Sequence, residues 1–394
     1  MRIVIFDPCL ADSGHYRYFN WHIAQLLDES GIEIIFADYA GYFKIWYKDL
    51  SLKKASFKII KVSGSISPQT NKYGPMRKLI KIITYLPDRK WYKHVLKNIE
   101  YLKPDLIIIT SEARGGEPAL YINKIFTPVI IVLHTIKAVS CDAVRTRLID
   151  FKLWRRFYIK ECNKFISKIN GILVLEEKLK NLLVNLGYNS VFRIPYLLFE
   201  DNIVNNTSKL SEEFLVSTIG GIYAGKNIEF IINCIESEQF IEFKYRVAGK
   251  ATGNYGSYIK NRVENLASKS VTGHFKLLST EDYIQEIEKA HFIALPYSNV
   301  RSDQASGVMF DAIRNYRPII APDIEPFASY VNNYNIGLLY KEGDKNSFID
   351  TVNKAKKLGV KAFMNDLIKF HKEFKYENWR SKFLEYILSK SKEL

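Results

Sequence analysis

Two glycine-bearing loops in the second half of the sequence carry residues suited to holding a phosphorylated ligand. The first, GGIYAGKN, contains Lys226 and lies between an apolar run, residues 214–219, and a helical pattern over residues 228–235. An anionic ligand needs compensating positive charge and N–H donors, and Lys226 followed by a helix N-terminus supplies both. Lys250 follows the predicted strand 245–248. This loop therefore predicts an anion site at the end of a buried strand.

The second loop contains Ser306, Gly307 and Val308, between a predicted strand at residues 292–295 and a helix over residues 308–315. Gly307 allows a ligand to approach the backbone closely. Because the first N–H groups of a helix are unpaired and its dipole is positive there, the turn favours an anion. This second loop therefore also predicts an anion site at a helix N-terminus.

Two carboxylates, Asp303 and Asp311, flank the second turn eight residues apart. Such carboxylates can accept hydrogen bonds from ligand hydroxyls. The alternative is structural, with Asp303 a solvated loop residue and Asp311 a charge on the helix surface. The spacing by itself leaves both interpretations open.

The first half of the chain offers Gly14 and His134. Gly14 lies in a turn-rich loop after the predicted strand at residues 2–6, but the G-x-G-x-x-G pattern of dinucleotide-binding proteins is absent. His134 directly follows the predicted strand 129–133, and open α/β sheets bind ligands at the carboxyl ends of their strands. The alternatives are a plain strand-to-helix turn at Gly14 and a loop histidine at position 134.

The stretch from Phe292 to Asp323 resembles the donor site of GT-B glycosyltransferases, in particular the retaining family 4 group. That family has two Glu separated by seven residues and a tail that Ala312 to Asp323 (AIRNYRPIIAPD) matches well. The sequence departs from the pattern in having Asp at both acidic positions. It also has Gly221 where the family carries an Arg beside the Lys that matches Lys226.

The resemblance implies a role for each candidate residue and no metal. Lys226, with Lys250, would neutralise the pyrophosphate, and the loop containing Gly14 would face the donor phosphates and the acceptor. The N–H groups around Ser306, Gly307 and Val308 would meet the diphosphate oxygens, while Asp311 would bind the ribose. Asp303 would bind the sugar hydroxyls and His134 would orient the transferred sugar, so these two are the catalytic candidates.

Alternating strand and helix patterns predict an α/β protein. The resemblance implies two Rossmann-like domains facing a cleft, the GT-B arrangement. We expect an N-terminal acceptor-side domain over residues 1–198 and a nucleotide-sugar domain over residues 199–375. A final helix, 376–394, is expected to cross back to the first domain. Besides those already named, strands are predicted at residues 32–37, 106–109, 171–175, 191–195, 275–278 and 319–321.

The formal charge of +15 is concentrated in the first domain: residues 1–198 carry +14 and residues 199–394 only +1. Basic residues alternate with aromatic and aliphatic ones over residues 72–103, a pattern typical of helices that lie on anionic membranes. The alternative is a pair of ordinary amphipathic helices. Nucleic-acid binding is disfavoured because no zinc spacing, helix-turn-helix or RNP-like pattern is present.

The cellular location is predicted from the start of the sequence, the length of its apolar runs and its cysteines. The sequence starts directly with a predicted strand, contains no apolar run of spanning length, and has four widely spaced Cys, which are expected to be reduced thiols. We therefore expect a cytoplasmic protein in peripheral contact with the inner face of the cell membrane.

The function predicted from this resemblance is sugar transfer, with retention, from a nucleoside-diphosphate sugar to a glycan or lipid-linked acceptor in surface polysaccharide synthesis. Two alternatives remain open. One is a GT-B-like sugar-nucleotide epimerase. The other is a non-catalytic homologue that acts as a scaffold at the membrane, which the departures at Gly221, Asp303 and Asp311 would favour.

Overall fold

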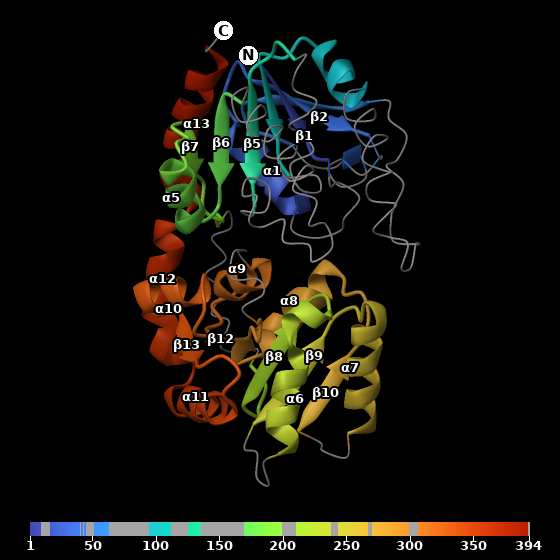
Figure 1. Ribbon diagram of the computed structural model, residues 1–394, viewed down its shortest axis with the longest axis vertical. Coiled ribbons are helices and arrows are strands. Elements are labelled where there is room, and N and C mark those ends of the chain that lie inside the picture. Colours follow the sequence, from blue (N-terminus) through green and yellow to red (C-terminus); the bar gives the residue numbers. More distant parts are fainter. Residues whose placement is uncertain are drawn as a thin grey trace, which may run out of the picture. The chain divides into compact units, whose positions relative to one another are not determined.

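The computed structural model shows two compact units, one formed by residues 1–197 with 376–394 and the other by residues 198–375. The structure describes residues 1–8, 16–39, 41, 43–44, 51–62, 94–111, 125–134, 169–198, 210–237, 243–266, 270–298 and 306–392. Each unit contains one sheet in which every pairing is parallel, and helices connect the strands (Figure 1). The predicted α/β class is therefore correct.

The first sheet has seven strands in the order β3-β2-β1-β4-β5-β6-β7. Their bounds are β1 Arg2–Phe6, β2 Glu33–Asp38, β3 Ser56–Lys61, β4 Leu106–Ile109, β5 Val129–Leu133, β6 Gly171–Val174 and β7 Val191–Arg193. Apart from Arg2, the central strands β1, β4 and β5 consist of Val, Ile, Leu and Phe and are buried on both faces, as expected for a parallel sheet. The strand order reverses direction between β1 and β4, which is where such sheets bind ligands.

Three helices of the first unit are described in full: α1 Tyr16–Leu26, α5 Glu177–Asn185 and α13 Tyr376–Ser391. The C-terminal helix α13 returns to this unit, beside β7 in Figure 1. Its Arg380 pairs with Glu29 at 2.8 Å, and the Tyr386 hydroxyl donates to the Ser190 carbonyl at 3.0 Å. The last helix is thus an integral part of the first unit.

The second sheet has six strands in the order β10-β9-β8-β11-β12-β13. Their bounds are β8 Leu215–Ile219, β9 Lys244–Ala248, β10 Val271–His274, β11 Phe292–Ala294, β12 Ile319–Pro322 and β13 Gly337–Tyr340. The order reverses between β8 and β11, so the carboxyl ends of these two strands form the switch point of the sheet. Lys226 follows β8, and α9, which starts at Gly307, follows β11.

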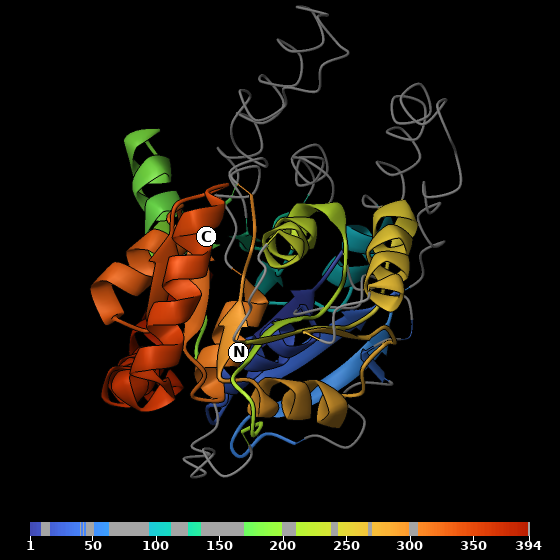
Figure 2. The same cartoon turned by 90° about the horizontal axis from the view of Figure 1, so that it is seen from below.

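Helices cover both faces of the second sheet. They are α6 Ile228–Glu236, α7 Gly253–Asn265, α8 Thr280–Lys289, α9 Gly307–Arg314, α10 Phe327–Tyr334, α11 Lys345–Leu358 and α12 Met364–Glu373. Figure 2 shows α6 and α7 on one side of the sheet and α8 on the other. This doubly wound arrangement places the N-termini of α8 and α9 at the carboxyl ends of the strands that precede them.

The strand predicted at residues 275–278 is wrong, because the structure places β10 four residues earlier, at Val271–His274. β10 is an edge strand with only Val271 buried, so its sequence lacks the apolar run of a central strand. The more apolar FKLL segment instead forms the connection to α8, and its Leu277 is 73% exposed. The edge strands β3 and β13 were not predicted from the sequence.

No helix in the described ranges is both long enough and apolar enough to cross a membrane. Cys234 is a buried thiol; the other three cysteines lie outside the described residues, as does most of the basic segment 72–103.

Candidate functional site

The turns that follow β8 and β9 pack backbone against backbone. The N–H of Gly220 donates to the Ala248 carbonyl at 2.9 Å, and the N–H of Ile222 donates to the Lys250 carbonyl at 2.9 Å. Gly249 has φ +145, and a Cβ at this position would lie 2.0 Å from the Gly220 carbonyl oxygen. Glycine is therefore required at position 249 both for its backbone angle and for the close approach of the two turns.

Lys226 lies in the turn after β8 and is almost completely buried, with 3% of its surface exposed. Its ammonium donates to the backbone carbonyl of Ile219, the last residue of β8. No carboxylate of the described residues contributes to its titration, and burial alone lowers its pKa to about 7. A buried cation with one neutral partner is costly, so this position favours an anionic ligand.

The N-terminus of α9 lies against the same turn. A Cβ added at Gly220 would be 3.1 Å from Nζ of Lys226 and 3.5 Å from Cγ2 of Val308. Gly220 thus brings the lysine and the first turn of α9 together at the switch point. The N–H groups of Gly307 and Val308 precede the first intrahelical hydrogen bonds, so they belong to the part of a helix that binds anions.

Ser306 is the N-cap of α9, and its hydroxyl accepts from the N–H of Met309 at 3.4 Å. The Tyr297 hydroxyl lies 3.2 Å from the same oxygen, and the Tyr297 ring stacks on Phe327 with centroids 5.5 Å apart. Ser306 therefore orders the helix start, a structural role that the sequence pattern did not reveal.

Asp311 lies one turn further along α9. Its Oδ2 accepts from the Tyr283 hydroxyl at 2.9 Å, and its Oδ1 is 3.7 Å from Nη1 of Arg314. Burial raises the pKa of the Asp311 carboxyl, while the Arg314 guanidinium and the Tyr283 hydroxyl oppose that rise. Tyr283 belongs to α8, so no spacing within the sequence could have linked it to Asp311.

Of the remaining predicted donor-site residues, Lys250 is exposed in the turn after β9. Its backbone pairs with the turn that precedes Lys226, but its side chain makes no described contact with the site. Its role as a second cation stays a prediction. Gly14 and Asp303 lie outside the described residues.

His134 lies in the first unit, directly after β5 as predicted. Its Nε2 is 2.9 Å from the Thr110 carbonyl oxygen, and its ring meets the Phe19 ring edge-on with centroids 5.3 Å apart. Because a carbonyl only accepts hydrogen bonds, this contact places a proton on Nε2. The backbone of the β4 end thereby fixes the orientation of the imidazole.

A buried polar cluster beside His134 was not predicted. Asp7 follows β1, and its carboxylate accepts from Nδ2 of Asn20 at 2.6 Å and from the Ser111 hydroxyl. The Thr110 hydroxyl in turn donates to Oδ1 of Asn20. All four side chains are fully buried. The cluster joins the carboxyl ends of β1 and β4 at the switch point of the first sheet, next to the carbonyl that holds His134.

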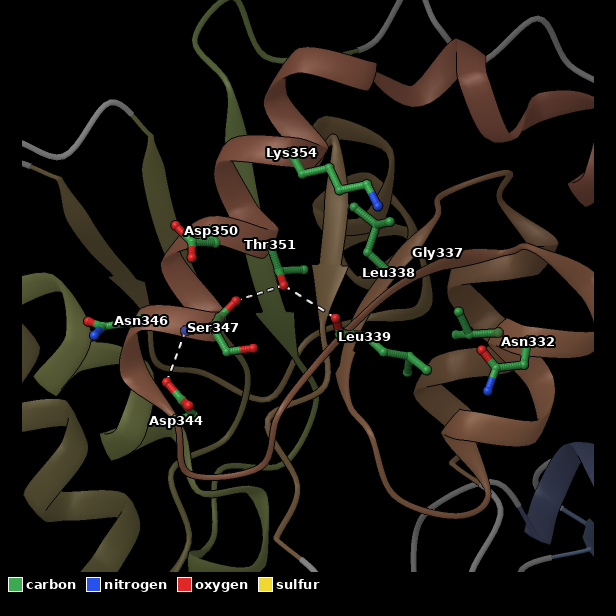
Figure 3. Close-up of a pocket in the computed structure, with 11 residues that line it drawn as sticks. Asn332, Gly337, Leu338, Leu339, Asp344, Asn346, Ser347, Asp350, Thr351 and Lys354 are labelled. Carbon is green, nitrogen blue, oxygen red and sulfur yellow. Dashed lines mark hydrogen bonds between the residues drawn. The ribbon is translucent and has the colours of Figure 1, made fainter.

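A separate hollow of about 590 Å³ lies between α10, β13 and α11 in the second unit (Figure 3). Some of its lining groups bond to one another: the Thr351 hydroxyl donates to the Ser347 carbonyl at 2.7 Å, and Asp344 accepts from the N–H of Ser347 at 3.0 Å. These bonds cap and brace α11, so we assign the hollow no ligand.

Within the described ranges, no three His, Cys, Asp or Glu side chains are grouped so that they could hold a metal ion. The positive charge described at the switch point of the second sheet comes from Lys226 and from the α9 N-terminus.

Comparison with known families gives a match for the second unit. Residues 199–374 match the family described as glycosyl transferases group 1. No curated protein sequence matches the chain significantly.

Solved structures similar to this one span the whole chain. Anabaena Alr3699/HepE in complex with UDP has a TM-score of 0.68 at 12% identity, covering 99% of this chain and 100% of that one. Sucrose-phosphate synthase from Thermosynechococcus elongatus has a TM-score of 0.67 at 14% identity, with 99% and 98% covered. The lipopolysaccharide outer core galactosyltransferase WaaB has a TM-score of 0.62 at 13% identity, with 99% and 100% covered.

Proposed function

We propose that the chain transfers sugar from a nucleoside-diphosphate sugar held by the second unit, because residues 199–374 match the family described as glycosyl transferases group 1 and the chain has the GT-B glycosyltransferase fold. The observation that carries this proposal is the burial of Lys226 at the switch point with a backbone carbonyl as its described partner. The diphosphate of the donor would supply the missing negative charge. HepE, which has the same fold, was crystallised with UDP and with UDP-glucose, which supports this class of donor.

We assign the other residues the roles that the resemblance implies. The N–H groups of Gly307 and Val308 bind diphosphate oxygens, and Asp311 accepts hydrogen bonds from the ribose. In the transition state the leaving diphosphate gains charge, which Lys226 and the helix dipole stabilise without a metal. We propose that His134 orients the transferred sugar.

We further propose that the anomeric configuration is retained and that the acceptor is a glycan or a lipid-linked glycan of a surface polysaccharide. The charge of +14 on residues 1–198 supports peripheral contact with an anionic membrane on its cytoplasmic face. NMR of the product tests retention directly, and binding to vesicles with and without anionic lipid tests the membrane contact.

The donor site is tested by a thermal-shift screen with UDP, GDP, ADP, TDP and CMP in the presence of a chelator. A ligand that binds only the folded protein raises its Tm by mass action. We expect one nucleoside diphosphate to produce a clear shift, and Lys226→Met to weaken its binding by about 10- to 100-fold. Lys260→Met, which removes an exposed lysine of α7, is the matched control and should bind like the wild type.

If none of these nucleotides shifts the Tm, or if Lys226→Met binds as tightly as Lys260→Met, the proposed diphosphate site is wrong. Binding without transfer or donor hydrolysis would instead favour the non-catalytic alternative.

A further inference from the structure

We propose that Tyr283 is a positioning residue of the donor site, whose hydroxyl orients the Asp311 carboxylate toward the ribose of the nucleotide. The inference rests on the proposed function, in which Asp311 binds that ribose. It adds a residue from a different helix to the donor site.

The two helices that carry these residues both begin at the carboxyl edge of the second sheet. α8 starts after β10 and is capped by Ser279, whose hydroxyl accepts from the N–H of Asp282 at 3.0 Å. Tyr283 lies in the first turn of α8, where its N–H donates to the Ser279 carbonyl at 2.9 Å. From this fixed position its hydroxyl reaches Oδ2 of Asp311 on α9 at 2.9 Å. The hydrogen bond therefore joins two helix starts at the edge where the nucleotide is proposed to bind.

Both oxygens of Asp311 have a partner. Oδ2 accepts from Tyr283, and Oδ1 is 3.7 Å from Nη1 of Arg314 one turn further along α9. Among the residues that the structure describes, Arg314 has no other carboxylate partner, and its buried Nε and Nη2 have no hydrogen-bond acceptor. Its charge therefore acts mainly on Asp311.

This support still leaves Asp311 able to bind a ligand. An ionised carboxylate offers about four lone-pair sites, of which Tyr283 occupies one and the longer contact to Arg314 at most another. Two vicinal hydroxyls of a ribose can donate to the remaining sites. A carboxylate one methylene shorter than Glu has less reach, so its orientation matters more.

The electrostatics agree with this geometry. Burial raises the pKa of Asp311, and the Tyr283 hydroxyl is one of two groups that oppose the rise. Without that hydroxyl the carboxylate would be protonated at a higher pH and would bind the ribose hydroxyls less well. Loss of Tyr283 should thus change both the affinity and its dependence on pH.

The experiment is a double-mutant cycle on nucleotide affinity with Tyr283→Phe, Asp311→Asn and the double variant. The probe is UDP, or the nucleoside diphosphate of the screen with the largest Tm shift, measured by calorimetry. We expect Tyr283→Phe to weaken binding by about fivefold when Asp311 is present and to have no effect when Asn occupies position 311. The acid side of the affinity profile should shift to higher pH in Tyr283→Phe.

Two controls separate positioning from general damage. Tyr258→Phe removes another hydroxyl of the second unit that donates to a carboxylate, Glu229 at 2.8 Å, and should leave affinity unchanged. The 2′,3′-dideoxy form of the same nucleotide lacks the ribose hydroxyls, so it should bind wild type and Tyr283→Phe equally.

The outcomes also distinguish this inference from the proposed function. If the nucleotide binds the wild type but Tyr283→Phe has no effect, or the effects of the two substitutions simply add, Tyr283 does not act through Asp311 and the inference is overturned. It is overturned as well if Asp311→Asn does not weaken binding. If no nucleotide binds the wild type, the proposed function itself fails.

Discussion

Lys226 provides the most quantitative test of the proposed site, because donor binding should be accompanied by proton uptake. In the empty protein burial lowers the pKa of this lysine to about 7. At pH 8 it is therefore about 90% neutral, and at pH 7 about half neutral. A bound diphosphate favours the charged ammonium, so binding should take up about 0.9 protons at pH 8 and about 0.5 at pH 7.

The assay is calorimetric titration with the nucleotide sugar whose base the screen identifies. A sugar diphosphate has no group of its own that titrates between pH 7 and 9, so proton exchange reports on the protein. Measurements at one pH in two buffers with different ionisation enthalpies, such as Tris and HEPES, give the number of protons taken up. The affinity should also fall by about fivefold between pH 7 and pH 8, and by about tenfold per pH unit above pH 8.

Lys226→Arg is the informative variant, because arginine keeps its charge at every accessible pH. It should bind without proton uptake and with an affinity that is nearly independent of pH. If the wild type binds at pH 8 without taking up protons, Lys226 is already charged in the empty protein and our reasoning about its burial is wrong.

The same lysine makes a prediction for the stability of the empty protein. Its folded-state pKa is lowered from the usual 10.5 to about 7, so between these pH values the unfolded state binds more protons than the folded state. The free energy of unfolding should therefore increase with pH in that window, by about 1.4 kcal/mol per unit. Denaturant titrations at several pH values give the free energy of unfolding of wild type and of Lys226→Met as a function of pH. The difference between the two pH dependences isolates the contribution of Lys226, and equal pH dependences would contradict the prediction.

Three further predictions concern packing and pH. Gly249→Ala should destabilise the second unit by about 2 kcal/mol or more, seen as a lower Tm, because its Cβ would lie 2.0 Å from the Gly220 carbonyl oxygen. Gly171→Ala places a Cβ 2.2 Å from the Tyr386 hydroxyl and should also lower the Tm; Tyr386→Phe in the same chain should restore part of the loss, and no recovery would argue against this contact. Glu286 is buried, yet its arginine and histidine partners hold its pKa below the usual 4.5. Its contribution to the free energy of unfolding is therefore present above pH 4.5 and lost as the pH falls further. In Glu286→Gln the free energy of unfolding should fall less steeply with decreasing pH.

The sequence was most informative where strands are buried on both faces. The predicted ranges for β1, β4 and β5 agree with the structure residue for residue. A short apolar run bounded by polar residues is typical of a strand that is buried on both faces. At three of the four sheet edges, β3, β10 and β13, the same rule failed, whereas the edge strand β7 was predicted two residues too long. β10 has one buried residue, while the apolar segment after it carries the 73% exposed Leu277. Edge strands are defined by their pairing with a neighbour, which no local pattern encodes.

The site shows the same division between what is local and what is not. The loop containing Lys226 and the segment at Gly307 could be recognised from the sequence as connections between a strand and a helix, because a strand, a glycine and a helix start follow one another in the chain. The support of Asp311 by Tyr283 could not, since their helices are separated by β11 and meet only when β10, β9, β8 and β11 lie side by side.

The burial of Lys226 likewise depends on a distant segment. Gly249 allows the turn after β9 to pack against the turn after β8, and α9, which starts some 80 residues after the lysine, closes over Gly220. An exposed lysine in the same loop would attract a diphosphate only weakly, because water screens its charge. The packing of three separate segments thus converts a common residue in a common loop into a site at which binding an anion and binding a proton are coupled.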